Sequence, residues 1–184
     1  MNTALTDTVR YEERGGVALI TIDNPPVNGL GDTVRRGLAE GLARAAASTA
    51  VRAVVLQGAG KLFCGGADIR QFNTPAASAQ PMLREVNRSI EASAKPVVAC
   101  IHGVALGGGL ELALACDIRI AGPAATLGLP ETRWGLLAGA GGTQRLARTV
   151  GAGAAKLMMF TADPVDAAEA LRIGLVHEVV EADQ

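Results

Sequence analysis

The spacing of hydrophobic residues changes along the chain, and the pattern predicts strands that are followed by helices. Residues 17–23 form a β-branched, apolar run that predicts a strand, and residues 24–26 end it because they contain two prolines, which cannot continue strand pairing. Apolar residues then recur at helical spacing as far as Ser48, which predicts a helix with Asp32 as its N-cap. Further strands are predicted at 51–57, 96–101 and 117–121, and further helices at 82–93, 110–116, 143–150, 154–161 and 165–172.

The run at 96–101 is apolar without interruption, which is typical of a strand that is covered on both faces. Strands and helices alternate along the chain, and we find no internal repeat and no linker. The pattern therefore predicts an α/β fold with a largely buried sheet. The length of 184 residues fits one domain, or one domain with a short extension.

The composition changes the expected packing of this core. The chain has 23 Gly but only one Trp, one Tyr and three Phe, although 49% of its residues are hydrophobic. Glycine usually makes up about 7% of a protein. We therefore expect a core that closes by aliphatic packing and by close approach of the backbone.

Charge and cysteine content exclude several classes of function. The net charge is -1 and no basic stripe is present, which disfavours nucleic-acid binding. The longest uncharged apolar run, 96–110, is too short to span a bilayer, and the first residues lack the pattern of a signal peptide. Cys64, Cys100 and Cys116 fit neither a disulfide framework nor a metal knuckle. We expect a soluble, cytosolic protein with reduced thiols.

Three familiar motifs are incomplete. The segment Gly58 to Lys61 resembles the end of a phosphate-binding loop, but Leu62 stands where Ser or Thr would be needed to bind magnesium. The other glycine clusters do not complete the G-x-G-x-x-G fingerprint of dinucleotide-binding proteins. No serine lies in a G-x-S-x-G nucleophile motif, so serine hydrolase chemistry is disfavoured.

Glu111 is the most informative single residue. The positions three and four residues away on the predicted helix are Gly107, Gly108, Leu114 and Ala115, so no basic side chain can pair with it locally. Either this side chain is buried on an apolar face, where a carboxylate is costly unless it is protonated or partnered, or the helix turns it toward water. Functional sites are the places where such a cost is tolerated.

A second carboxylate and a glycine run supply the other candidate elements. Glu131 follows Pro130, and a Pro-Glu pair commonly begins a helix. The segment between Glu111 and Glu131 is long enough for the chain to bring the two carboxyl groups close together. The run 107–109 at a strand-to-helix junction leaves backbone amides free to meet a ligand oxygen, as in an oxyanion hole, or it serves close packing of the helix on the sheet. The loop 65–68 is a candidate for a second amide.

Together these motifs resemble the crotonase superfamily and, within it, the enoyl-CoA hydratases. The segment NPPVN at 24–28 is further similar to the hydratase module that opens multifunctional fatty-acid oxidation enzymes. The matching stretches follow the order of the family and cover most of the chain: FCGGADI at 63–69, KPVVA at 95–99, GVALGGGLELA at 103–113, LPE at 129–131, GAGGTQRL at 139–146 and GLV at 174–176.

The resemblance implies a crotonase-like α/β fold of repeated ββα units. It places the two oxyanion amides on Ala67 and Gly108, where they would face the thioester oxygen of an acyl-CoA. The two hydratase glutamates fall on Glu111 and Glu131, and in the family they activate the water that adds at C3 and deliver the proton to C2. The implied reaction is reversible hydration of trans-2-enoyl-CoA in fatty-acid oxidation, with no metal and no cofactor apart from the coenzyme A of the substrate.

The same resemblance implies a substrate-binding loop and an assembly. Gly65, Asp68 and Ile69 would contact coenzyme A. Trp134 would either line or narrow the acyl pocket or anchor the core, and we favour the core. Residues 1–184 would form a catalytic core that ends before the C-terminal helices with which the family closes its site and builds trimers or hexamers. Fusion to a 3-hydroxyacyl-CoA dehydrogenase module would mark a multifunctional enzyme.

Two alternative activities accompany the hydratase hypothesis. A double-bond isomerase of the family can work with a carboxylate at the position of Glu131 alone, whereas Glu111 in addition favours hydration. A non-catalytic module that binds acyl-CoA is the alternative from another functional class.

Overall fold

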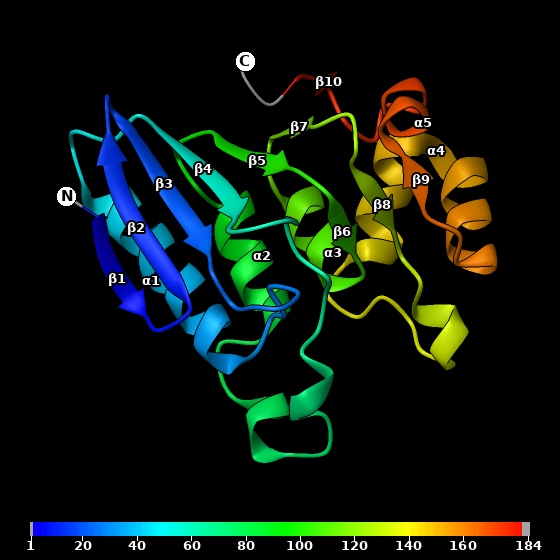
Figure 1. Ribbon diagram of the computed structural model, residues 1–184, viewed down its shortest axis with the longest axis horizontal. Helices are drawn as coiled ribbons and strands as arrows, with labels where there is room; N and C mark the ends of the chain where they lie inside the picture. The colour runs from blue at the N-terminus through cyan, green and yellow to red at the C-terminus, as the bar shows by residue number, and fades with distance from the viewer. Residues whose placement is uncertain (1, 182–184) are drawn as a thin grey trace.

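The computed structural model describes residues 2–181, and in these residues strands and helices alternate as the sequence predicts (Figure 1). The strands are β1 (Asn2–Thr6), β2 (Val9–Arg14), β3 (Val17–Ile22), β4 (Ala53–Gly58), β5 (Val97–Ile101), β6 (Val104–Leu106), β7 (Ile118–Ala121), β8 (Thr126–Gly128), β9 (Val165–Asp166) and β10 (Glu178–Val179). The α-helices are α1 (Asp32–Ala47), α2 (Leu83–Glu91), α3 (Gly108–Ala115), α4 (Gly142–Thr161) and α5 (Ala167–Arg172). Three short 3-10 helices are η1 (Ile69–Gln71), η2 (Pro75–Ser78) and η3 (Glu131–Trp134).

The strands form two sheets. The larger has the order β1-β2-β3-β4-β5-β7-β10, in which β1, β2 and β3 are antiparallel and the strands from β3 onward are parallel. The smaller has the order β6-β8-β9. In two successive ββ units, β5 with β6 and β7 with β8, the first strand joins the large sheet and the second joins the small one, and a helix follows. The predicted crotonase-like α/β fold is therefore confirmed.

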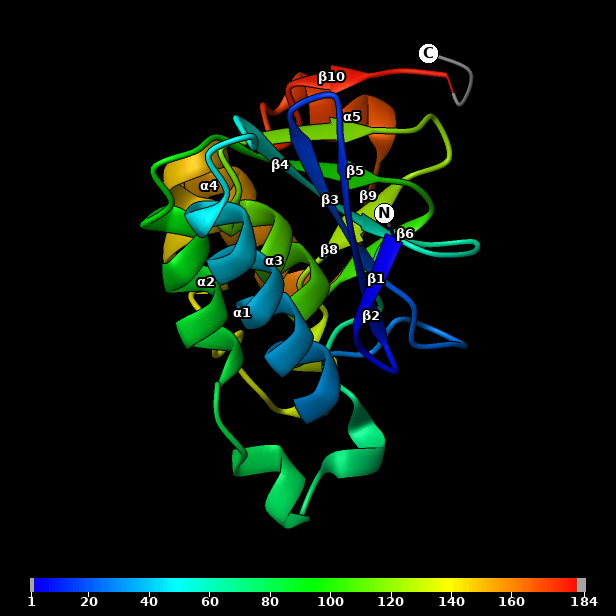
Figure 2. The same cartoon turned by 90° about the vertical axis from the view of Figure 1, so that its left-hand side faces the viewer.

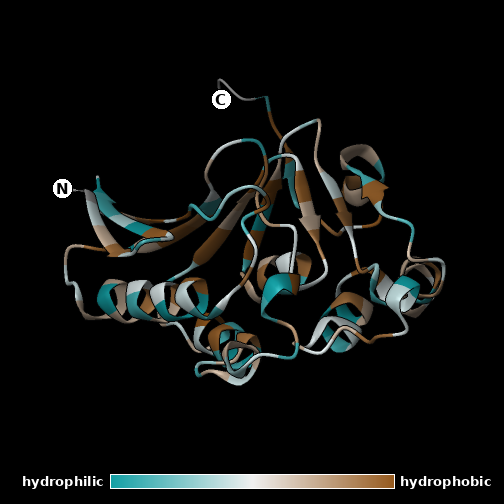
Figure 3. Cartoon of the chain, turned by 60° about the horizontal axis from the view of Figure 1, so that its bottom comes forward, coloured by the Kyte–Doolittle hydropathy of each residue, from teal (hydrophilic) through white to brown (hydrophobic). Residues whose placement is uncertain are grey.

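The helices cover one face of the large sheet. Figure 2 shows α1, α2 and α3 together on one side of the strands, with α4 beyond them. The central strands are mainly hydrophobic, whereas the first hairpin carries hydrophilic residues (Figure 3). Helix α3 is the most enclosed element, since all eight of its residues are buried. In the part of the chain that the structure describes, no helix is both long and apolar enough to cross a membrane.

Several predicted boundaries need correction. Gly31, not Asp32, is the N-cap of α1. Asp32 lies in the first helical turn, where its negative charge interacts favourably with the positive end of the helix dipole. The segment predicted as a helix from 165 begins with strand β9, and the helix starts at Ala167 with the Asp166 side chain as its cap. The N-terminal hairpin of β1 and β2 was not predicted at all.

Close backbone packing is confirmed at three glycines. A Cβ atom at Gly58, Gly103 or Gly109 would overlap a backbone carbonyl oxygen of the segment 61–64. At Gly109 this oxygen belongs to Cys64, whose strand-like bridge to Ala105 holds the segment against the start of α3. Glycine is therefore the only residue that lets helix α3 lie this close to the loop.

Gly109→Ala is expected to lower the free energy of unfolding by about 3 kcal/mol, because the methyl group and the Cys64 carbonyl cannot occupy the same space. The matched control is Gly153→Ala in α4, where a Cβ atom would meet nothing within 4 Å. That change is expected to raise the unfolding free energy by about 0.5 kcal/mol through helix propensity. Equilibrium denaturation in urea measures both, and equal effects at the two sites would contradict the packing argument.

Candidate active site

A cavity of about 470 Å³ opens between two parts of the chain that project from the sheets. One is the segment that carries η1 and η2, and the other carries η3; both extend from the lower side of the molecule in Figure 1. The floor between them is the start of α3. The lining residues are Gly65, Gly66, Ala67, Ile69, Phe72, Gly107, Gly108, Pro130, Glu131, Trp134 and Leu136.

The backbone amides of Ala67 and Gly108 lie on neighbouring segments of this lining. A Cβ atom built on Gly108 would be 3.6 Å from the Ala67 nitrogen, and one built on Gly66 would be 3.4 Å from the Gly108 nitrogen. Neither amide has a hydrogen-bond acceptor within residues 2–181. The fold thus presents two free donors side by side, one of them at the positive end of a helix, as an oxyanion requires.

Hydrogen bonds fix the loop that carries Ala67. The Gly65 amide donates to the Val27 carbonyl at 2.8 Å, and the Gly66 carbonyl accepts from the Leu30 amide at 2.8 Å. Gly66 has a φ of 103°, a conformation that a side chain rarely adopts. The loop is therefore held in place before any ligand binds, and its amide position is preorganised.

Glu131 faces the cavity from the first position of η3. Its Oε2 atom is buried and has no hydrogen-bond partner in the described chain. Its Oε1 atom lies 3.2 Å from the place where a Cβ atom of Gly107 would be, so glycine at that position makes room for the carboxyl group. A buried acceptor without a partner is rare and costly in native proteins, and it points to a functional role.

Glu111 lies behind the cavity wall, in the first turn of α3, and it does not line the cavity itself. Only 3% of this residue is exposed, so of the two alternatives that the sequence left open, the buried one is correct. Its Oε1 atom accepts hydrogen bonds from the amides of Ala140 at 2.7 Å and Gly142 at 2.8 Å. These two donors belong to the glycine-rich segment 139–142 at the start of α4. The sequence pattern indicated no contact between this segment and Glu111.

The two carboxyl groups have different surroundings and influence each other. Burial raises the pKa of Glu111, while the amides of Gly142 and Ala140 and the charge of Arg145 lower it in part. Burial also raises the pKa of Glu131; its own backbone amide lowers that pKa in part, and the negative charge of Glu111 raises it. The charged form of Glu111 thus has two amide donors, whereas Glu131 keeps one buried oxygen without a partner among the described residues.

The remaining loop residues divide between two cavities. Gly65 and Ile69 line the cavity of Ala67 and Glu131, and 75% of Ile69 is exposed. Asp68 instead lines a neighbouring cavity of about 160 Å³. Its carboxylate accepts two side-chain hydrogen bonds from Arg70, each 2.8 Å long, and these hydrogen bonds hold the pKa of Asp68 below its usual range.

The interpretation of Trp134 as a core anchor is wrong. The residue is 79% exposed and lines the cavity three positions after Glu131, because η3 has no buried position. Phe72 and Leu136 also line the cavity and were not predicted. Both are apolar residues in irregular segments, where no periodicity indicates which way a side chain points.

The arrangement suits acid–base chemistry next to a developing oxyanion. Two amides are free to bind an oxygen, one carboxyl group borders the cavity, and a second lies within electrostatic reach of the first. Among the residues with described structure, no three His, Cys, Asp or Glu side chains are grouped so that they could hold a metal ion.

Comparison with known proteins gives consistent matches. A family model described as enoyl-CoA hydratase/isomerase matches residues 12–184. The chain is 51% identical over 173 residues to the peroxisomal bifunctional enzyme of Danio rerio, covering 94% of this chain and 24% of that protein. It is 44% identical to the short-chain-enoyl-CoA hydratase of Clostridium acetobutylicum, covering 97% and 70%. The crystal structure of an enoyl-CoA hydratase from Bacillus anthracis superposes with a TM-score of 0.88 at 36% identity, covering 96% and 71%. The chain spans about a quarter of the length of the relatives that are named bifunctional enzyme or multifunctional protein.

Proposed function

The chain belongs to the enoyl-CoA hydratase/isomerase family, and from this premise we propose that it catalyses reversible hydration of a trans-2-enoyl-CoA to a 3-hydroxyacyl-CoA. The observation that carries the proposal is the pair of glutamates, one bordering the cavity and one just behind its wall, beside two amides that lack an acceptor. The relatives named enoyl-CoA hydratase support the same reaction class.

The two amides would bind the thioester oxygen of the substrate. Addition of water at C3 moves negative charge onto that oxygen, so donors fixed in advance stabilise the enolate-like transition state more than the substrate. Ala67 is held by its loop and Gly108 by the start of α3, so neither donor has to reorganise as the charge develops. Each such donor contributes about 3 kcal/mol in comparable sites.

The environments of the glutamates assign them different roles. Glu111 accepts two amide hydrogen bonds, which favour its charged form, so we infer that it is the general base that activates water. Glu131 has an unpartnered oxygen and a like charge nearby, both of which favour its protonated form. We infer that it is the general acid that protonates C2.

A direct assay tests the proposal. Incubation of the chain with crotonyl-CoA is expected to remove the ultraviolet absorbance of the conjugated thioester and to yield 3-hydroxybutyryl-CoA, identified by chromatography. Calorimetric binding of the thioester without turnover would overturn the proposal in favour of a binding module. Conversion of a 3-enoyl-CoA to the conjugated isomer, without hydration, would overturn it in favour of an isomerase.

Trp134→Ala is expected to raise KM for enoyl-CoA several-fold, because the indole lines the cavity. It is expected to change the free energy of unfolding by less than about 0.5 kcal/mol, since an exposed side chain loses little packing. Phe160→Ala is the matched control, because Phe160 is 73% exposed and lies outside the cavity lining. Steady-state kinetics and urea denaturation measure both, and a large loss of stability at Trp134 alone would restore the core interpretation.

A further inference from the structure

The turn 139–142 is contacted from both of its sides. On one side, the amides of Ala140 and Gly142 donate to Glu111. On the other, the Ala140 carbonyl accepts from Arg145 Nη1 at 2.8 Å and from Asn87 Nδ2 at 3.1 Å. A single residue, Ala140, therefore connects two side chains of α2 and α4 to the carboxylate of α3.

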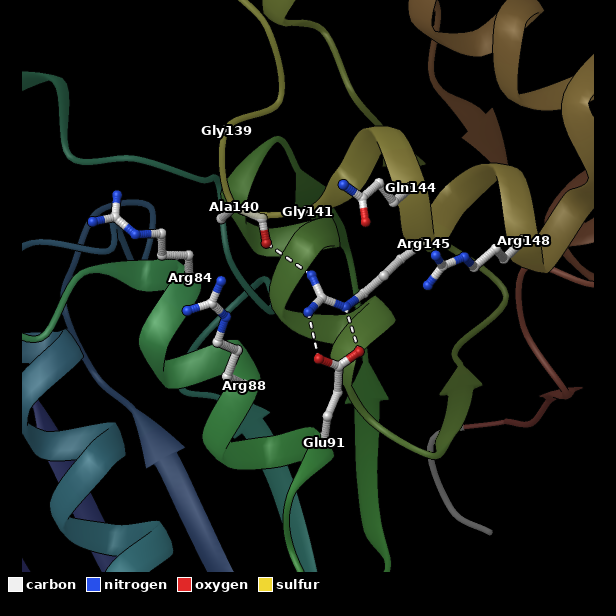
Figure 4. A pocket seen from close by; sticks show the side chains of 9 residues that line it. All are labelled: Arg84, Arg88, Glu91, Gly139, Ala140, Gly141, Gln144, Arg145 and Arg148. Carbon is white, nitrogen blue, oxygen red and sulfur yellow. Dashed lines mark hydrogen bonds and ion pairs between the residues drawn. The ribbon is translucent and has the colours of Figure 1, made fainter.

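Arg145 is itself held by an ion pair. Its Nε and Nη2 atoms donate to the two carboxylate oxygens of Glu91 at 2.7 and 2.6 Å, as the dashed lines in Figure 4 show. The guanidinium group thus uses one edge for Glu91 on α2 and its remaining nitrogen for the Ala140 carbonyl. The contact with Glu91 is a bidentate ion pair, which arginine can form and lysine cannot.

We propose that Arg145 and Asn87 are positioning residues for Glu111, acting through the turn 139–142, with Glu91 orienting the Arg145 side chain. This inference rests on the proposed function of Glu111 as the general base. Neither side chain lines the cavity of Glu131, so neither contacts the substrate.

The composition of the turn explains why it needs outside support. Three of its four residues are glycine, and Gly141 has a φ of 104°. Glycine has the largest conformational freedom of any residue, so the turn does not fix its own amides. The only hydrogen-bond donors to Glu111 that the described residues supply are amides of this turn. A shift of the turn would therefore move the carboxylate away from its productive position.

Asn87 provides independent support. The residue is fully buried, yet only its amide nitrogen is used, and its Oδ1 atom has no partner among residues 2–181. An apolar residue of similar size would avoid burying this unsatisfied oxygen. The hydrogen bond to the Ala140 carbonyl is the contact that asparagine makes here and an apolar residue could not.

Charge around Glu111 adds a measurable signature. The positive charge of Arg145 lowers the pKa of Glu111. The nearby carboxyl groups are Glu91, which pairs with Arg145, and Glu131, whose own pKa is raised by the charge of Glu111. Three further arginines surround the cavity of about 340 Å³ in Figure 4 without forming an ion pair within the described chain. They are Arg84 and Arg88 on α2 and Arg148 on α4.

The test compares four variants by two methods. The pKa of Glu111 is measured by carbon-13 NMR of its carboxyl group, and kcat and KM are measured with crotonyl-CoA across pH. Arg145→Gln is expected to raise the pKa of Glu111, because it removes a positive charge that lowers it. It is also expected to lower kcat about tenfold with little change in KM, because misplacing a reacting group costs rate rather than binding. Arg145→Lys is expected to keep the pKa near that of the wild type but still to lower kcat.

Two further variants separate this role from general loosening of the fold. Glu91→Gln leaves the Arg145 charge in place and removes a like charge, so it is expected not to raise the pKa of Glu111. Arg148→Gln, the matched control, removes a positive charge from the same cavity without a contact to Ala140 and is expected to leave kcat unchanged. If all four variants raise the pKa and lower kcat alike, the positioning role is overturned.

The Asn87→Leu variant tests whether loss of activity could result from misfolding. It is expected to lower kcat while leaving the free energy of unfolding near the wild-type value, because the lost hydrogen bond is offset by removal of a buried unpartnered oxygen. Unchanged kcat in this variant would exclude Asn87 from the proposal. The NMR titration does not depend on turnover, so an inactive wild type would refute the proposed function, whereas an unmoved pKa of Glu111 in Arg145→Gln would refute the positioning role alone.

Discussion

Glu131→Gln is expected to lower kcat for enoyl-CoA hydration about 10³-fold while KM stays within a factor of about two. Glutamine has nearly the shape of a protonated glutamic acid, so it fills the same place beside Gly107, but it cannot release a proton to carbon. The fold should persist, because the buried Oε2 atom has no hydrogen bond to lose within the described chain.

The dependence on pH distinguishes the two glutamates. If Glu111 is the base, kcat/KM falls as pH drops through its pKa; if Glu131 is the acid, kcat/KM falls as pH rises through its pKa. The residual activity of Glu131→Gln should then lack the alkaline limb, and that of Glu111→Gln the acidic limb. Retention of both limbs in either variant would contradict the assignment, and undiminished turnover in the double variant would refute the mechanism.

Stability gives a second, independent readout of Glu131. Its folded-state pKa is raised above the unfolded value. The stability linked to this group is therefore fully present below the unfolded pKa and is lost as pH rises through the folded pKa. The free energy of unfolding of the wild type should fall relative to Glu131→Gln over that interval. A constant difference between the two proteins across pH would show that the pKa of Glu131 is not raised.

Gly66→Ala is expected to lower kcat about 100-fold, the effect of losing one oxyanion donor. Its Cβ atom would lie 2.7 Å from the Leu106 carbonyl oxygen and 3.4 Å from the Gly108 nitrogen. To relieve that contact the loop must move away from the start of α3, and the Ala67 amide moves with it. Steady-state kinetics with crotonyl-CoA measure the loss.

Gly60→Ala is the control for backbone strain. Gly60 also has a positive φ, 75°, but a Cβ atom there would meet nothing within 4 Å. Gly60→Ala is expected to lose about 1 kcal/mol of stability from an alanine in the left-handed region, and Gly66→Ala is expected to lose more because its Cβ atom also meets the Leu106 carbonyl oxygen. Only Gly66→Ala should lose activity, and equal losses of activity would mean that loop strain, rather than the position of the Ala67 amide, controls the rate.

The sequence predicted those parts of the molecule in which a local pattern determines the structure. The buried central strands appear in the sequence as apolar runs. The helices predicted at 143–150 and 154–161 correspond to the two parts of α4, which is kinked at Gly151, where φ is 81°. The apolar neighbours of Glu111 at helical spacing allowed either burial or exposure of its side chain, and the structure shows burial. The α/β class followed from the alternation of strands and helices, and the family followed from motifs that keep the same order along most of the chain.

The parts that were missed depend on contacts between distant segments. In strand β2 of the first hairpin only Val9 and Tyr11 are fully buried, and both strands of the hairpin carry several polar residues and lack an apolar run. The core was favoured over the acyl pocket for Trp134, but a four-residue 3-10 helix has no periodic pattern that could indicate its exposure. The contact between Asn87 and Ala140 joins residues 53 positions apart, a distance over which spacing carries no information.

The first turn of α3 combines two functions in one rigid body. Gly108 supplies a backbone donor, and Glu111, three residues later on the same buried helix, supplies a side chain. In the proposed mechanism, activation of the thioester therefore depends on main-chain amides that no ordinary side-chain replacement removes, whereas proton transfer depends on side chains that can be replaced. A protein engineer could retain enolate stabilisation while varying positions 111, 131 and 134 to direct the same intermediate toward other reactions of acyl thioesters.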